Sequence, residues 1–298
     1  MKSLRLGVSY AVSFSSDGRR LGVAGRDVSM WDLGTRTKVW RAHPLSHPAS
    51  VAFSPDGLYM AVKNTSGTVL LLDVATGASS CNFANASDGE GSGLEFSSDG
   101  SEIVDGSWSG WLRVRQANSG AIEFAREYPG EMITAVHRTA DGTQWTVVHA
   151  MKVTAPNSAP KNDYCSVWRW PFHGGSLFEQ PLASEYVRST ALSPDGKFLA
   201  YTHGRPPARL SVIRLQDGLE IAAVEAGPAS SLGAVAWSPN MSRLAAVHKE
   251  RVVQYTWPAL KVADEWEVPY AAQVAYAPGG GLLAIAAWHA GTVVEVHE

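Results

Sequence analysis

Short runs of apolar residues alternate with short polar segments along the whole chain. For example, Val51-Ala52-Phe53 is followed by the polar turn Ser54-Pro55-Asp56-Gly57 and then by a second apolar run, Met60-Ala61-Val62. Another polar segment separates this run from Val69-Leu70-Leu71-Leu72. Runs of this length, spaced by Gly- and Asp-containing turns, are typical of β-strands. We find no segment with the 3.6-residue periodicity of an amphipathic helix, so the pattern predicts an all-β fold.

The polar turn recurs at a nearly constant period. Its seven versions are Ser15-Ser16-Asp17-Gly18, Ser54-Pro55-Asp56-Gly57, Ser97-Ser98-Asp99-Gly100, Thr139-Ala140-Asp141-Gly142, Ser193-Pro194-Asp195-Gly196, Ser238-Pro239-Asn240-Met241 and Ala277-Pro278-Gly279-Gly280. The last residues of successive turns are 39, 43, 42, 54, 45 and 39 residues apart. A period of this size indicates a repeated supersecondary unit, and four short strands per unit are typical of a propeller blade. We therefore predict a seven-bladed β-propeller with four-stranded antiparallel blades, built by residues 1–298 as a single domain.

The two ends of the chain are expected to complete one blade together. After the last turn there is room for two more strands, near Leu282–Ala287 and Thr292–His297, so the seventh unit lacks a fourth strand. A spare stretch, Ser3–Leu6, precedes the first unit. An unpaired strand edge favours aggregation. We therefore predict that Ser3–Leu6 forms the outer strand of the last blade and closes the ring.

These motifs resemble those of the WD-repeat family of β-propellers. The resemblance rests on the Phe-Ser-Pro-Asp-Gly phrase, an apolar strand, and then Met30-Trp31-Asp32-Leu33-Gly34 or its counterpart Leu71-Leu72-Asp73-Val74-Ala75-Thr76-Gly77. It covers essentially the whole chain. Trp31-Asp32 is the one instance of the eponymous pair, and the Gly-His that often precedes the first strand in this family is missing. The resemblance implies a non-catalytic scaffold that binds another protein.

Composition narrows the classes of partner. The formal net charge is -3 and the isoelectric point is near 6.3, so there is no basic surface to suggest nucleic-acid binding. No apolar run reaches the roughly 18 residues that a membrane span needs. Cys81 and Cys165 lie in non-equivalent places and form no CxxC motif. We therefore expect reduced thiols and a cytoplasmic protein, monomeric by itself, with no cofactor.

Loops at one end of a propeller are the expected binding region, because loops on rigid scaffolds often carry function. One face of the ring carries the loops between blades and those between second and third strands, and the Asp-Gly turns lie on the other face. The longest insertion, residues 151–163, falls on the loop face. It is either a tolerated insertion or an arm that reaches a partner.

The family resemblance also implies contact positions on this face. In WD-repeat proteins these lie four and six residues before the apolar residue that precedes the Asp-Gly turn, and at the end of the second strand. The predicted partner-binding residues are Tyr10, Arg26, His47, Trp108, Met132, Tyr186, Arg188, Lys249, Tyr270 and Trp288. Tyr, Trp, Arg and Met are enriched at protein interfaces, although inter-blade packing would explain some of these residues equally well.

The sequence gives little evidence for a catalytic site or a metal site. His149, His203 and His248 occupy the same position in three consecutive units, and His289 lies two positions later in the seventh. Such positions on neighbouring blades are too far apart for shared zinc ligation, which needs nitrogens at about 2.0–2.1 Å from the metal. We expect no metal site and no catalytic residues. The alternative is a propeller enzyme or small-ligand binder, of a lactonase or lyase type, that uses the mouth of the central channel.

Overall fold

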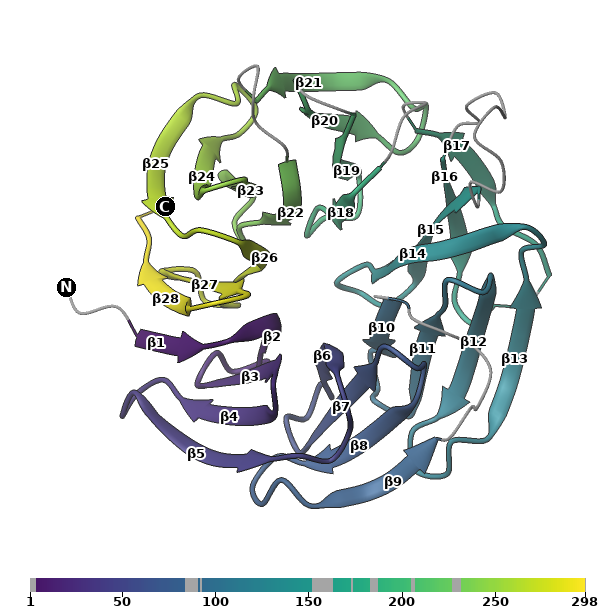
Figure 1. Cartoon of the computed structure of the whole chain (residues 1–298). Helices are drawn as coiled ribbons and strands as arrows, with labels where there is room; N and C mark the ends of the chain where they lie inside the picture. The colour runs from purple at the N-terminus through teal and green to yellow at the C-terminus, as the bar shows by residue number, and fades with distance from the viewer. Residues whose placement is uncertain are drawn as a thin grey trace.

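The computed structural model describes residues 4–83, 91, 93–151, 163–172, 174–182, 187–204, 207–226 and 232–297. These residues form seven four-stranded antiparallel sheets, arranged as the blades of a ring (Figure 1). The predicted seven-bladed β-propeller is thus confirmed. Within the described ranges there is no helix long and apolar enough to cross a bilayer.

Each blade runs from an inner strand to an outer strand in chain order, except the last. Blade 1 contains β2 (Ser9–Phe14), β3 (Arg20–Gly25), β4 (Val28–Asp32) and β5 (Thr37–Ala42). Blade 2 contains β6 (Pro48–Phe53), β7 (Tyr59–Asn64), β8 (Val69–Asp73) and β9 (Ser79–Phe83). Blade 3 contains β10 (Gly93–Phe96), β11 (Glu102–Gly106), β12 (Trp111–Gln116) and β13 (Ile122–Glu127). Blade 4 contains β14 (Glu131–Arg138), β15 (Gln144–Met151), β16 (Tyr164–Arg169) and β17 (Phe178–Pro181). Blade 5 contains β18 (Ser189–Leu192), β19 (Phe198–His203), β20 (Arg209–Arg214) and β21 (Glu220–Glu225). Blade 6 contains β22 (Leu232–Trp237), β23 (Arg243–His248), β24 (Arg251–Thr256) and β25 (Val262–Glu267). Blade 7 contains β26 (Ala271–Tyr276), β27 (Leu282–Ala287), β28 (Gly291–Glu295) and β1 (Leu4–Gly7).

The repeated polar turn is a self-contained hydrogen-bonded unit. In blade 1 the Ser15 hydroxyl donates to Asp17 Oδ1 at 2.6 Å and accepts from the Arg20 backbone N at 2.9 Å. Asp17 Oδ1 also accepts from the Arg19 backbone N at 3.0 Å. Side chains that bond their own backbone in this way favour a tight turn over continued strand. The same hydroxyl bond recurs in the turns of blades 2 to 6, so the local sequence defines where the first strand of each of these blades is reversed.

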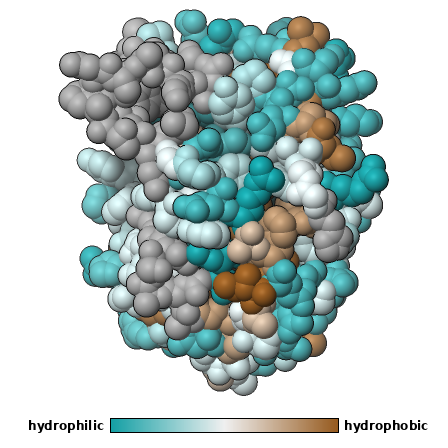
Figure 2. Space-filling view, turned by 90° about the vertical axis from the view of Figure 1, so that its right-hand side faces the viewer, coloured by the Kyte–Doolittle hydropathy of each residue, from teal (hydrophilic) through white to brown (hydrophobic). Residues whose placement is uncertain are grey.

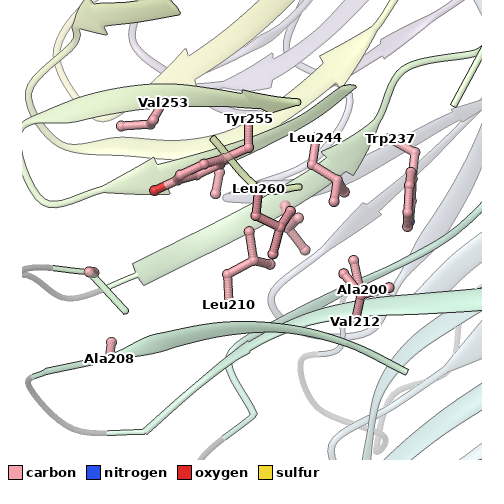
Figure 3. Close-up of a cluster of buried hydrophobic side chains, with 12 residues drawn as sticks. Ala200, Ala208, Leu210, Val212, Trp237, Leu244, Val253, Tyr255 and Leu260 are labelled. Carbon is pink, nitrogen blue, oxygen red and sulfur yellow. The ribbon is translucent and has the colours of Figure 1, made fainter. Parts of the chain in front are cut away.

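The core lies between the blades. Seven clusters of buried apolar side chains occur in the described residues, and each joins two neighbouring blades. In the cluster between blades 5 and 6, Leu210 and Val212 lie against Trp237, Leu244 and other side chains of the next blade (Figure 3). A blade buried on both faces needs apolar residues on both sides of its middle strands. This explains why those strands appear as continuous apolar runs rather than as alternating patterns.

The ring closes as predicted, with the N-terminal strand in the last blade. Strand β1 pairs antiparallel with β28, with Leu4 opposite Val293 and Arg5 opposite Thr292 (Figure 1). Strand β1 starts at Leu4 within the described residues, so Ser3 of the predicted segment lies outside them. The ends of the chain therefore share one sheet.

The outer strands face solvent. The flank of the ring shown in Figure 2 is mostly hydrophilic, with a few separate hydrophobic areas. Exposed apolar residues on the outer strands include Ile122 of β13 and Phe178 of β17. Neither residue belongs to any of the seven clusters between blades, so the outer strands contribute less to the core than the middle strands do.

Candidate partner-binding face

Three exposed aromatic side chains and one half-buried tyrosine meet on the loop face, where blade 7 adjoins blade 1. The ring centroids of Tyr10 and Trp288 are 4.9 Å apart, and those of Tyr270 and His289 are also 4.9 Å apart. The two pairs are linked because the Trp288 backbone N donates to the Tyr270 carbonyl at 3.1 Å. Trp288 remains 59% exposed and Tyr270 57% exposed. We call these four residues the aromatic patch.

The backbone at Tyr270 is unusual for a bulky residue. Val268, Pro269 and Tyr270 join β25 to β26, just as Tyr128, Pro129 and Gly130 join β13 to β14. In the second loop Gly130 has φ +77°, whereas in the first Tyr270 itself has φ +58°. A side chain in this left-handed region costs about 1–2 kcal/mol. The chain thus holds an exposed tyrosine where its own matched loop has glycine.

The other predicted residues are spread around the ring. Trp108, in the turn between β11 and β12 of blade 3, is 42% exposed. Arg26, Arg188 and Lys249 are exposed, and Met132 is half-buried in β14. Arg26 belongs to blade 1, as Tyr10 does, and the other four lie one each in blades 3, 4, 5 and 6. None of the five shares a ring contact with the aromatic patch within the described part of the chain.

His47 resembles Tyr270 in its backbone. It is exposed, it has φ +51°, and its carbonyl accepts from the Thr65 backbone N at 3.1 Å. Tyr186 lies outside the described residues. A role in partner binding stays a prediction for each of the ten residues.

Most of the predicted insertion also lies outside the described residues. Its first residue, Met151, ends β15 instead of starting a loop. Its last residue, Asp163, is buried, and one carboxylate oxygen accepts from the Val187 backbone N at 3.0 Å. Burial is the main reason why the pKa of Asp163 is raised. Both ends of the insertion are therefore tied to the body of the propeller.

A chain of hydrogen bonds crosses all four strands of blade 4. His149 Nδ1 bonds to Glu131, His149 Nε2 lies 2.7 Å from Ser166 Oγ, and Ser166 Oγ donates to Glu179 Oε1 at 3.2 Å. The order Ser–His–Glu is that of a catalytic triad. However, Ser166 is fully buried, and its hydroxyl proton points to Glu179 rather than to the histidine. A nucleophile must be reached by substrate, so this chain of bonds ties the strands together instead.

The two other aligned histidines are also bonded within their own blades. His203 Nε2 lies 3.0 Å from Ser211 Oγ, and His248 Nε2 lies 2.9 Å from the Tyr255 hydroxyl. Burial lowers the pKa of His248 to about 4, with Arg251 adding to the effect. Among the residues that the structure describes, no group of three or more His, Cys, Asp or Glu side chains is arranged to hold a metal ion.

Ionisable groups on the inner strands pair between neighbouring blades. Glu95 Oε1 of β10 lies 3.9 Å from Arg138 Nε of β14, and His137 Nε2 lies 2.8 Å from Thr190 Oγ1 of β18. Burial raises the pKa of Glu95 to about 7, against the opposing effect of Arg138. Burial also lowers the pKa of His137 to about 4. One contact joins blade 3 to blade 4 and the other joins blade 4 to blade 5.

Sequence reasoning missed several of these partners. In the sequence His289 is marked only by its offset from the other histidines, although in the structure it packs on Tyr270. Glu131 and Ser166 carry no motif of their own, and their link to His149 depends on strand register. The repeated position of His149 in the blades was the one available signal.

Comparison with solved structures finds the same fold over nearly the full chain. The hydrazine synthase of Kuenenia stuttgartiensis superposes with a TM-score of 0.83 at 15% identity, covering 98% of this chain and 96% of that chain. The β-propeller domain of Cps50 (Swd1) from Myceliophteria thermophila superposes with a TM-score of 0.81 at 16% identity, covering 99% of each. No family model matches the sequence. No curated protein matches it either. At these identities the similarity is one of fold: the chain is a seven-bladed β-propeller.

Proposed function

We propose that this protein is a non-catalytic scaffold of the WD-repeat type, which binds another protein on its loop face around the aromatic patch. The observation that carries the proposal is the conformation of Tyr270. Its backbone is strained, and its ring remains largely exposed. Residues in such strained backbone conformations cluster at active sites and ligand clamps.

The residues around Tyr270 support the same proposal. Tyr and Trp dominate binding hot spots, because they bury large areas at low conformational cost. Trp288 and Tyr270 leave this area open while their backbones are fixed by the hydrogen bond between them. A surface held rigid before binding loses less entropy on association. The similarity in fold to the Swd1 propeller domain agrees with a WD-repeat-type scaffold.

The test compares proteins captured from an extract of the source organism by wild type and by variants. Trp288→Ala removes the largest ring, and Tyr270→Gly removes a ring while relieving the backbone. Leu58→Ala is the matched control, because Leu58 is 60% exposed but follows an Asp-Gly turn on the opposite face. We expect specific partners to be captured by wild type and by Leu58→Ala. The amount captured by each of the two patch variants should be at least about tenfold lower.

Stability measurements separate loss of binding from loss of fold. Because glycine adopts φ > 0 freely, Tyr270→Gly should unfold at the same or a higher urea concentration than wild type. Equal capture by all four proteins, or no specific capture at all, would contradict the proposal.

A further inference from the structure

A cavity of about 610 Å³ lies on the outer flank of the ring, where the outer strand of blade 6 faces blade 7. Its walls come from β25, from β1, β27 and β28, and from the turn between β4 and β5 of blade 1. Volumes of about 300–1,000 Å³ are typical of ligand sites. We call this cavity the flank groove. It lies on different strands from the aromatic patch.

The floor of the flank groove is apolar and incompletely covered. Trp266 and Val294 lie at the edge of the core cluster between blades 6 and 7, and Leu4, Leu33 and Leu282 lie at the edge of the cluster between blades 7 and 1. All five line the groove, and each is only partly buried. Two core clusters therefore reach the surface at the same place, where an apolar group could be buried.

The rim of the groove is acidic. Glu265, Glu267 and Glu295 line it together with one arginine, Arg36, and with His297. Three glutamates against one arginine leave a formal charge of -2 when His297 is neutral. Arg251 pairs with Glu265 from outside the lining, at 3.0 Å. Among the described residues, Glu267 has no ion-pair partner.

Arg36 already places a guanidinium on this rim. Its Nη2 lies 3.0 Å from Glu295 Oε1, and both side chains remain partly exposed. Arg36 has φ +57°, in a turn where the equivalent residues of blades 2, 3 and 5 are Gly77, Gly120 and Gly218, with φ of 69–73°. The equivalence rests on Asp32 and Asp73, which accept from the backbone N of Thr35 and Thr76 at 2.8 Å each. The chain thus keeps a strained arginine that reaches the groove.

We propose that the flank groove binds a segment of a partner protein in which a lysine or arginine side chain neighbours an apolar side chain. The apolar group would lie on the floor beside Trp266. The cation would form an ion pair with the Glu267 carboxylate, or would compete with Arg36 for the Glu295 carboxylate. Aromatic rings and carboxylates both attract cations, so the groove should prefer basic segments to acidic ones. This site is distinct from the one proposed on the loop face.

The test is a selection of a phage-displayed random dodecapeptide library on the immobilised full chain. The groove variant Glu267→Gln/Glu295→Gln removes two rim charges. The matched control is Glu225→Gln/Glu220→Gln in blade 5, because Glu225 stands opposite Arg209 as Glu267 stands opposite Arg251. Glu220 is paired with Arg209 as Glu295 is with Arg36. Selected peptides are then labelled, and their Kd values are measured by fluorescence anisotropy.

We expect selected peptides to combine Lys or Arg with apolar residues. Their Kd should rise at least about tenfold in the groove variant, and it should stay within about twofold of wild type in the control. It should also stay unchanged in Trp288→Ala, which separates this site from the loop face. The proposal is overturned if no peptide is selected, if the selected peptides lack basic residues, or if the groove variant binds them as tightly as wild type does.

Discussion

At the scale of single residues, the hydroxyl–carboxylate pairs of the repeated turns carry the most local information. Ser15–Asp17, Ser97–Asp99 and Thr139–Asp141 each have an O–O distance of 2.6 Å. In blade 6 the acceptor is neutral, and Ser238 lies 2.9 Å from Asn240. Hydrogen bonds to an ionised acceptor are shorter and stronger. The hydroxyl bond is the main reason why the pKa of Asp17, Asp99 and Asp141 is lowered from 3.8.

These lowered pKa values predict how stability depends on pH. Because the folded pKa lies below the unfolded one, the stabilisation is complete above about pH 4 and is lost as the pH falls through the folded value. Asn240→Asp should therefore raise the free energy of unfolding at pH 7, by less than about 1 kcal/mol because the turn is open to solvent. Urea unfolding at pH 7 and pH 3 checks this, and a gain that is the same at both pH values would refute it.

At the scale of elements, the short strand β1 closes the ring. It supplies the outer edge of blade 7 and places Leu6 in the core cluster between blades 7 and 1. The next strand, β2, fastens the same junction, because Ser9 Oγ accepts from the Ala287 backbone N at 3.1 Å. Closure therefore depends on a few residues at the beginning of the chain.

Replacing Leu6 should destabilise the whole ring. Leu6→Ala deletes a side chain that is 5% exposed, and large-to-small changes in a core cost about 2–5 kcal/mol. Its neighbour Arg5 is exposed on the same strand, so Arg5→Ala should change stability by no more than about 0.5 kcal/mol. Both are measured by urea unfolding at pH 7. Similar values for the two variants would show that β1 is dispensable.

At the scale of the whole molecule, blades are held together by buried charges as well as by apolar clusters. Between blades 2 and 3, Lys63 Nζ lies 2.5 Å from Asp105 Oδ1 and donates to the Gly106 carbonyl at 2.6 Å. Arg115 Nε is 3.7 Å from the other Asp105 oxygen. All three charged side chains are at most 3% exposed. One carboxylate thus serves two cations from neighbouring blades.

Neutralising that carboxylate should cost far more than neutralising one on the surface. Asp105→Asn leaves Lys63 buried without its counter-charge, a change that typically costs about 3–5 kcal/mol. Glu220→Gln breaks the partly exposed pair with Arg209 and should cost less than about 1 kcal/mol. Chemical unfolding of both variants gives the comparison. An Asp105→Asn loss as small as that of Glu220→Gln would mean that the buried pair contributes little.

Most of the fold could be predicted from sequence, and so could three residues of the aromatic patch, Tyr10, Tyr270 and Trp288, but the contacts between them could not. Asp17 and its counterparts act within six residues of the chain, so their pattern is visible in the sequence. The Tyr10–Trp288 contact joins residues from opposite ends of the chain. Lys63 and Asp105 also meet only because blades 2 and 3 pack face to face. No periodic pattern marks such contacts.

The sequence by itself determined the number of blades, the positions of their turns and the closure by β1. Turns and strands are encoded by residues that are close together in the chain, and the same pattern recurs in each blade. The tertiary structure decided which side chains meet between blades. It brought His149 to Glu131 and Ser166, assembled the aromatic patch, and left the flank groove open beside Trp266. These contacts depend on how blades lie against one another, and that arrangement exists only once the ring has closed.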